Sequence, residues 1–206
     1  TICEYRRRAT LVKKDYKCIN KCKFEDEEMK EKVGLDFTEL AMKADFKFCP
    51  KCGSLYPATI KKIEAYFDII QIQERLKKSI ELLYSAHCES AIREAIIKLE
   101  TKIQELANLY NLNGTKLIGE AFKYEIDKDD NITVRPRIEI NSLSDITEIN
   151  EHDGVKLMLM GFFKGIRNIY MHKSINAEIY YTLNIITQVS MFLTIIEGAN
   201  LVDRIE

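Results

Sequence analysis

Apolar residues recur every three or four positions over most of the chain after residue 58. That spacing places them on one face of an α-helix and predicts a series of amphipathic helices. The first helix is predicted over residues 59–83. The second is predicted over residues 86–110 and ends at the Asn-Leu-Asn-Gly sequence of residues 111–114, because asparagine and glycine terminate helices. The apolar stripe of this second helix consists of Cys88, Ala91, Ile92, Ala95, Leu99, Ile103, Leu106 and Tyr110.

The pattern changes after residue 114. Residues 115–122 predict a short helix, and residues 124–150 lose the helical period, so we expect a loop there that can include a short hairpin. A long helix is then predicted to begin near residues 150–153. A last helix is predicted over residues 175–197, with Ser174 as its N-cap. This last helix is apolar on more than one face, as expected of a helix that packs both in its own bundle and against a partner.

Composition favours an all-α protein, since the 206 residues include only 8 glycines and 3 prolines and no tryptophan. The sequence pattern changes at residues 56–58, which predicts two domains over residues 1–57 and 58–206. The 31 Lys and Arg residues nearly balance the 32 Asp and Glu residues, so any binding of nucleic acid must depend on local patches. We find neither a signal peptide nor an apolar run of membrane-spanning length, and therefore expect a cytoplasmic protein without a membrane partner.

Two cysteine pairs near the N-terminus have the spacing of a structural zinc site. Cys49 and Cys52 are followed by a glycine that permits a tight turn, and Cys18 and Cys22 lie about 26 residues earlier. Four thiolates from two such pairs can hold one Zn²⁺ ion, whose binding would supply folding energy to a segment too short for its own core. We therefore expect a zinc-ribbon-like module over residues 1–57. The alternative is that only the second pair is structured.

Three consecutive arginines at residues 6–8 lie beside this expected module. Zinc ribbons hold nucleic acids or proteins, and the arginines favour contact with the phosphates of RNA or DNA. A solvated basic arm without a ligand is the alternative interpretation.

The sequence Arg-Asn-Ile-Tyr-Met-His at residues 167–172 places polar side chains near the end of an apolar helix. On an α-helix Asn168 and His172 lie about 40° apart, whereas Arg167 lies about 140° from His172. Arginine binds phosphate oxygens in a fork, and histidine can take or give a proton near neutral pH. RNA cleavage by its own 2′-hydroxyl needs these groups and no metal. The alternative is that the basic side chains only complement the helix dipole.

This Arg-Asn-x-x-x-His sequence, between two long apolar helices, resembles the Arg-x4–6-His motif of the HEPN superfamily. More specifically, residues 85–205 resemble its Ymh-like branch, which is found in uncharacterised prokaryotic and phage-associated proteins. The segments that carry the resemblance begin at His87, Gly114 and Gly161. The resemblance implies a bundle of four or five helices that dimerises. In active members, arginine and histidine residues from two protomers form a metal-independent ribonuclease site.

Carried onto this chain, the resemblance implies that Arg167 holds the scissile phosphate and that His172 acts as the acid or the base. Asn168 would orient the histidine or bind phosphate. Family members often place an acidic residue of an earlier helix near this site. Glu94 or Glu100 can fill that role, although an ordinary ion pair is the alternative for each.

These observations predict an endoribonuclease of the defence or toxin type, which cleaves RNA as a homodimer through its C-terminal helices and is restrained by an antitoxin or another regulatory partner. We expect structural Zn²⁺ and no catalytic metal. Some HEPN nucleases have a tyrosine two residues after the histidine, where this chain has Ser174, so chemistry that needs this tyrosine is excluded. One alternative is a non-catalytic nucleic-acid-binding or adaptor module, with Arg167 and His172 bonded within the chain. Another is a partner of a nucleotidyltransferase that modifies one of three tyrosines, Tyr170, Tyr180 or Tyr181.

Overall fold

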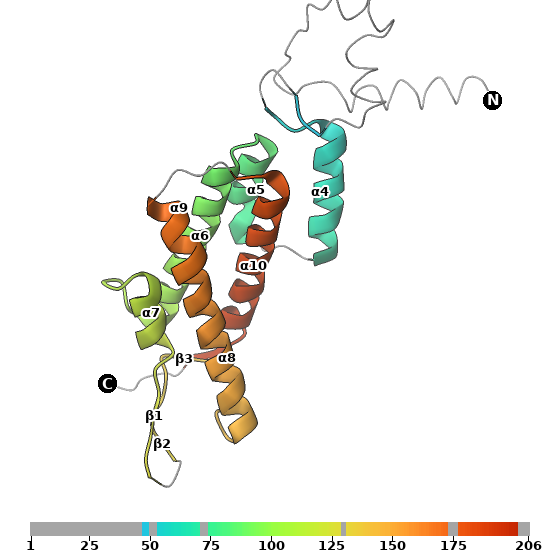
Figure 1. Ribbon diagram of the computed structural model, residues 1–206. Coiled ribbons are helices and arrows are strands. Elements are labelled where there is room, and N and C mark those ends of the chain that lie inside the picture. Colours follow the sequence, from blue (N-terminus) through green and yellow to red (C-terminus); the bar gives the residue numbers. More distant parts are fainter. Residues whose placement is uncertain (1–46, 50–52, 71–73, 129–130, 173–176, 202–206) are drawn as a thin grey trace, which may run out of the picture. The chain divides into compact units, whose positions relative to one another are not determined.

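The computed structural model describes residues 47–49, 53–70, 74–128, 131–172 and 177–201 (Figure 1). The chain divides into two compact units. The first comprises Thr1–Ile72 and Glu81–His87, and the second comprises Gln73–Ile80 and Cys88–Glu206. The predicted domain boundary between residues 57 and 58 stays a prediction, because residues 1–46 lie outside the described part of the chain.

The first unit contains a tight turn followed by helix α4 (Pro57–Ile70). The N–H groups of Cys49 and Gly53 donate to the carbonyls of Ser54 and Cys49, at 2.8 and 2.7 Å. Gly53 has a φ of +74°, a left-handed conformation that favours glycine, so the predicted turn after the second cysteine pair is confirmed at this residue. Pro57 begins α4, where the missing N–H of proline costs no helical hydrogen bond.

The prediction of one helix over residues 59–83 is wrong. After α4 the chain forms a 3₁₀ turn, η1 (Glu74–Leu76), and then helix α5 (Lys77–Tyr84). The apolar pattern explains this break, because Leu76 comes nine residues after Phe67 and would lie about 180° from it on a continuous α-helix. Both side chains are nevertheless buried, which a single straight helix could not achieve against one surface.

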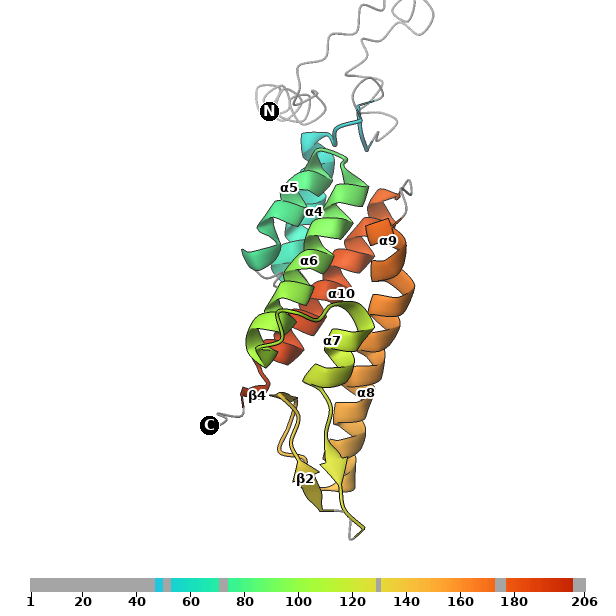
Figure 2. The ribbon, with the colours of Figure 1, turned by 90° about the vertical axis from the view of Figure 1, so that its left-hand side faces the viewer.

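In the second unit, two long helices form the centre of a bundle. Helix α6 (Cys88–Ala107) packs along α10 (Ile179–Glu197), and Figure 2 shows them side by side. The last helix begins at Ile179 rather than residue 175, and its N-cap residue Glu178 makes no side-chain capping bond, while Ser174 lies outside the described residues. The predicted second helix is confirmed, and the described chain is mostly helical, as predicted.

Helix α10 buries apolar residues on more than one side. Adjacent residues Ile185 and Ile186 are both buried, as are Phe192 and Leu193. By length and composition alone α10 is apolar enough to cross a membrane, and 44% of its most apolar 18-residue window is buried inside the protein. A core helix of this kind satisfies the same criteria.

A short helix and a hairpin follow α6, as predicted. Helix α7 (Gly114–Ala121) leads into strands β1 (Glu125–Ile126) and β2 (Ile132–Val134), which pair antiparallel. A second pairing was not predicted: β3 (Ile138–Glu139) lies antiparallel to β4 (Asn200–Leu201). Two-residue strands leave too little alternation in a sequence to be recognised.

Helix α8 (Ile146–Phe162) begins about four residues earlier than predicted. Its N-cap is Asp145, whose carboxylate accepts the N–H groups of Thr147 and Glu148 at 2.8 and 2.9 Å. Figure 1 shows α8 continuing into the short helix α9 (Asn168–His172) as one rod. A π-helical turn, η2 (Phe163–Arg167), joins the two helices.

A buried histidine on α8 fixes this helix to the end of α7. His152 is fully buried, and its Nε2 lies 3.1 Å from the carbonyl oxygen of Phe122. The imidazole ring of His152 packs against the rings of Phe122 and Tyr124, with centroids 5.7 Å apart in each case. The Nδ1 atom has no hydrogen-bond partner among the residues that the structure describes. Burial is the largest effect on the pKa of His152 and lowers it below 6.5, although the Phe122 carbonyl acts in the opposite direction.

This lowered pKa predicts acid sensitivity. Because the pKa of His152 is lower in the folded chain, the unfolded chain binds a proton at this residue at a higher pH than the folded chain does. The free energy of unfolding should therefore fall as the pH decreases from about 6.5. We expect denaturant unfolding curves to show this slope and the His152→Phe variant to show a smaller one. A slope of equal size in both proteins would exclude His152 as its source.

Candidate active site

The π turn η2 determines the direction of the side chains in the Arg-Asn-x-x-x-His sequence. The N–H of Asn168 donates to the carbonyl of Phe163, five residues earlier, where an α-helix would use a residue four earlier. A π turn inserts one residue and so rotates the following helix by about 100° relative to the preceding one. Turns of this kind occur frequently at functional sites.

This rotation brings Arg167 onto the buried side of the helix. Arg167 comes eight residues after the buried Leu159, which on a regular α-helix would place it about 80° away. The inserted residue reduces this angle to about 20°. The guanidinium therefore points into the bundle, and the Arg167 side chain is only 12% exposed.

Inside the bundle Arg167 meets a carboxylate of α6. Its Nη2 lies 3.3 Å from Oε2 of Glu100, whose side chain is 11% exposed. The other carboxylate oxygen, Oε1, accepts the backbone N–H of Gly114 at the start of α7. Gly114 has a φ of +57°, and a Cβ atom there would lie 3.9 Å from Nη1 of Arg167. One carboxylate thus joins α6, α7 and η2.

Most N–H donors of the Arg167 guanidinium make no hydrogen bond among the described residues. It makes one hydrogen bond within the described chain, to Glu100, and its buried Nε has no partner. Arginine has five N–H donors, so most of those of Arg167 are unpaired among the described residues.

Asn168 and His172 point away from this enclosed pair. Both residues are exposed on the outer side of α9. The predicted trio is therefore divided: Arg167 faces Glu100, whereas the histidine and asparagine face solvent. An open nuclease site predicts accessible side chains, and an adaptor predicts side chains bonded within the chain. The exposed His172 is as expected of a nuclease site, whereas the ion-paired Arg167 is as expected of an adaptor.

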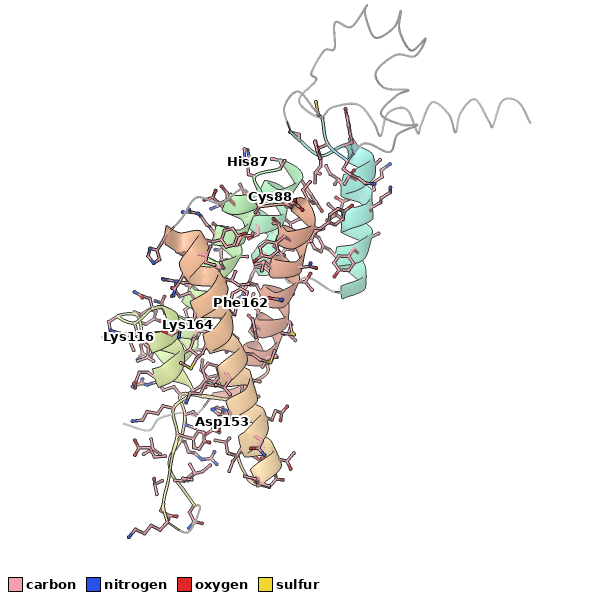
Figure 3. The ribbon with its side chains drawn as sticks, in the orientation of Figure 1. His87, Cys88, Lys116, Asp153, Phe162 and Lys164 are labelled. Carbon is pink, nitrogen blue, oxygen red and sulfur yellow. The ribbon has the colours of Figure 1, made fainter. Side chains whose placement is uncertain are left out.

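Two exposed lysines lie on the elements that meet at Gly114 and Arg167. Lys116 on α7 and Lys164 in η2 are exposed and lie where α7 packs against η2 (Figure 3). Neither has an ion pair among the described residues. Of the two candidate acidic residues, Glu100 lies at the site. Glu94 instead pairs with Lys78, at 3.0 Å, and with Lys98, at 3.9 Å.

The predicted zinc ligands are mostly outside the described residues. Only Cys49 is described, and it is fully buried beside the Gly53 turn. Cys18, Cys22 and Cys52 lie in the parts of the chain that are not described, so the Zn²⁺ site stays a prediction. Within the described ranges, no group of three or more His, Cys, Asp or Glu residues is arranged to hold a metal.

The other candidate residues are Cys88 on α6 and three tyrosines on α9 and α10. Cys88 is buried on the stripe of α6 as predicted, and burial raises the pKa of its thiol. Tyr170 is buried and stacks on Tyr181 with ring centroids 6.2 Å apart. Tyr180 and Tyr181 are 66% and 44% exposed, so these two are the accessible hydroxyls for the modification hypothesis.

Sequence reasoning missed the π turn and the role of Gly114. The π turn leaves no spacing signal, because the apolar residues on both sides of it fit a helical period. In the sequence the Asn-Gly before α7 indicates a helix stop, and Gly114 begins a segment of the family resemblance, but neither indicates a contact with Glu100. In the structure Gly114 presents an N–H to Glu100 in a conformation that other residues rarely adopt.

Comparison with protein families gives one match. Residues 71–196 match the family described as "Protein of unknown function (Hypoth_ymh)". The chain belongs to this family. The Hypoth_ymh region contains the Arg167 and Glu100 pair together with Gly114, Asn168 and His172, whereas all four predicted zinc ligands lie outside it. No curated protein and no solved structure matches the chain.

Proposed function

We propose that this Hypoth_ymh protein is a metal-independent endoribonuclease of the HEPN type that acts in prokaryotic defence or as a toxin. The observation that carries the proposal is the π turn: after it His172 and Asn168 are exposed to solvent, while Arg167 pairs with Glu100 where η2 meets α7. Cleavage by a 2′-hydroxyl requires a group that transfers protons and a positive charge at the phosphate, which an imidazole and a guanidinium can supply.

In this mechanism the substrate supplies its own nucleophile. His172 takes the proton of the 2′-hydroxyl or gives one to the departing 5′ oxygen, since imidazole can do either near neutral pH, and His172 of the other protomer or a water molecule makes the second transfer. Arg167 donates N–H groups to the phosphate as negative charge increases on its oxygens. Asn168 orients His172 or donates to the same phosphate. The products are a 2′,3′-cyclic phosphate and a 5′-hydroxyl.

The proposed site takes groups from two protomers. Arg167 and His172 lie about 140° apart on their helix, so one copy cannot easily aim both at one phosphate. A second copy can pack on the outer face of α8, defined here by Gly154, Leu157, Met158 and Gly161. These residues fall within an arc of about 100° that contains no charge. Leu157 and Met158 are 67% and 50% exposed, an unusual state for adjacent large apolar residues.

A charge on this face should separate the protomers. In Gly161→Glu the new side chain meets nothing within 4 Å of its Cβ, so the protomer can keep its fold. Burying the carboxylate between two copies would cost several kcal/mol, about enough to convert a dimer into a monomer at micromolar concentration. Sedimentation should show this, with Gly119→Glu on α7 as the matched control. A variant that remains dimeric would exclude this face.

The 2′-hydroxyl itself provides a test of the reaction. An RNA with a single 2′-deoxynucleotide at a mapped cleavage position should be cut at its other sites and left intact at that one. Cleavage at the 2′-deoxy position with unchanged efficiency would contradict the proposal, because the attacking oxygen would then come from elsewhere.

The adaptor function is the second candidate, and the Arg167 and Glu100 ion pair favours it. In that case the pair only joins α6 to η2, and the helical unit dimerises without catalysis. Mutation of His172 would then leave the affinity for RNA unchanged, and neither the wild type nor the variant would cleave RNA.

A further inference from the structure

The carboxylate of Glu100 occupies the position expected for an anionic ligand. Its two oxygens accept from two converging donors, the Arg167 guanidinium and the Gly114 N–H. Two oxygens of a phosphodiester would use the same kinds of donor. The two elements that meet at this point, α7 and η2, each carry an exposed lysine, Lys116 and Lys164, whose positive charge favours a polyanion.

We propose that Glu100 is an internal competitor of the RNA phosphate, and that the protein in this structure is in a restrained state in which Glu100 holds Arg167. This inference rests on the proposed function and names the regulation of its site. RNA binding displaces the carboxylate from Arg167, and the guanidinium then donates its unused N–H groups to the phosphate.

The geometry explains why displacement is feasible. Arg167 makes one hydrogen bond to Glu100, through Nη2, rather than the two parallel bonds of the strongest arginine and carboxylate pairs. Among the described residues its Nη1 and Nε make no hydrogen bond, so the guanidinium keeps unused N–H donors when the single bond to Glu100 is broken. An alternative role for Glu100 is to position Arg167 for the ligand, and the two roles predict opposite effects of mutation.

Removing the charge of Glu100 separates these roles. Glu100→Gln keeps an amide oxygen for the Gly114 N–H and deletes the competing charge. We expect a labelled 2′-deoxy oligonucleotide, which cannot be cleaved by this mechanism, to bind about tenfold tighter, as the loss of one charged hydrogen bond implies. The gain should disappear in the Glu100→Gln/Arg167→Ala double variant. Fluorescence anisotropy at fixed salt measures both, with Glu94→Gln on the same helix as the matched control. Equal or weaker binding by Glu100→Gln would overturn the proposal.

The wild-type chain gives a second readout in case the variant does not fold. Displacement of Glu100 removes the acceptor of the Gly114 N–H, so the amide resonance of Gly114 should shift when the same oligonucleotide saturates the protein. Saturation without a shift at Gly114 would also overturn the proposal. Because neither experiment uses cleavage, an inactive protein can still confirm competition at Arg167, and an active nuclease can still contradict it.

Discussion

The His172→Ala variant is expected to cleave RNA about 10²–10⁴-fold more slowly than the wild-type chain while it stays folded, because a positioned proton-transfer group contributes a factor of this size. His172 is exposed at the end of α9, so its removal leaves no cavity and no unpaired buried group. Initial rates of cleavage of a labelled RNA measure the loss, and thermal unfolding measures the unchanged stability.

The chain provides a matched control for this variant. Of its three histidines, His152 is buried and His87 is exposed in the other compact unit. His87→Ala removes an exposed imidazole from a place to which no role is assigned, and its rate should equal that of the wild type. Equal cleavage rates for His172→Ala and the wild type would show that His172 takes no part in the reaction.

Arg167→Ala is expected to lose both activity and stability. The substitution leaves the Glu100 carboxylate in a position where its side chain is 11% exposed and its cationic partner is gone. Breaking such a pair from one side costs about 3 kcal/mol. The N–H of Gly114 still donates to Glu100 and offsets part of that cost. Denaturant unfolding should show the loss of stability, and the cleavage assay should show loss of the phosphate ligand.

A second substitution separates these two losses. In the Arg167→Ala/Glu100→Gln variant the unpaired charge is gone, so most of the stability should return while cleavage stays absent. If the double variant regains both, then Arg167 acts only through the fold of the bundle. If it regains neither, then the lost stability does not come from the charge of Glu100.

The central helices could be predicted from the sequence because their apolar residues keep one period over many turns. The α6 stripe from Cys88 to Ile103 is buried throughout, as predicted. The helix starts were less predictable. Asp145 and Ser174 are both acceptable caps by residue type, and only the folded chain shows that Asp145 accepts two N–H groups at the start of α8.

The site residues could be selected from sequence, but their orientation could not. A regular helix predicts that Arg167 lies near the edge of the buried stripe, and the π turn moves it to the centre. Whether such a turn forms depends on how Phe163 and Tyr170 pack inside the unit, where both are buried. Packing between distant segments also explains why Glu100, rather than Glu94, is the partner of Arg167.

The most direct test of the nuclease proposal is cleavage of RNA by the purified chain in excess EDTA, beside the Arg167→Ala and His172→Ala variants, once the chain is shown to remain folded in the chelator. The account predicts products that end in 2′,3′-cyclic phosphate from the wild type and none from either variant. Equal products from all three proteins, or no cleavage by a folded, dimeric wild type across diverse RNAs, would contradict it.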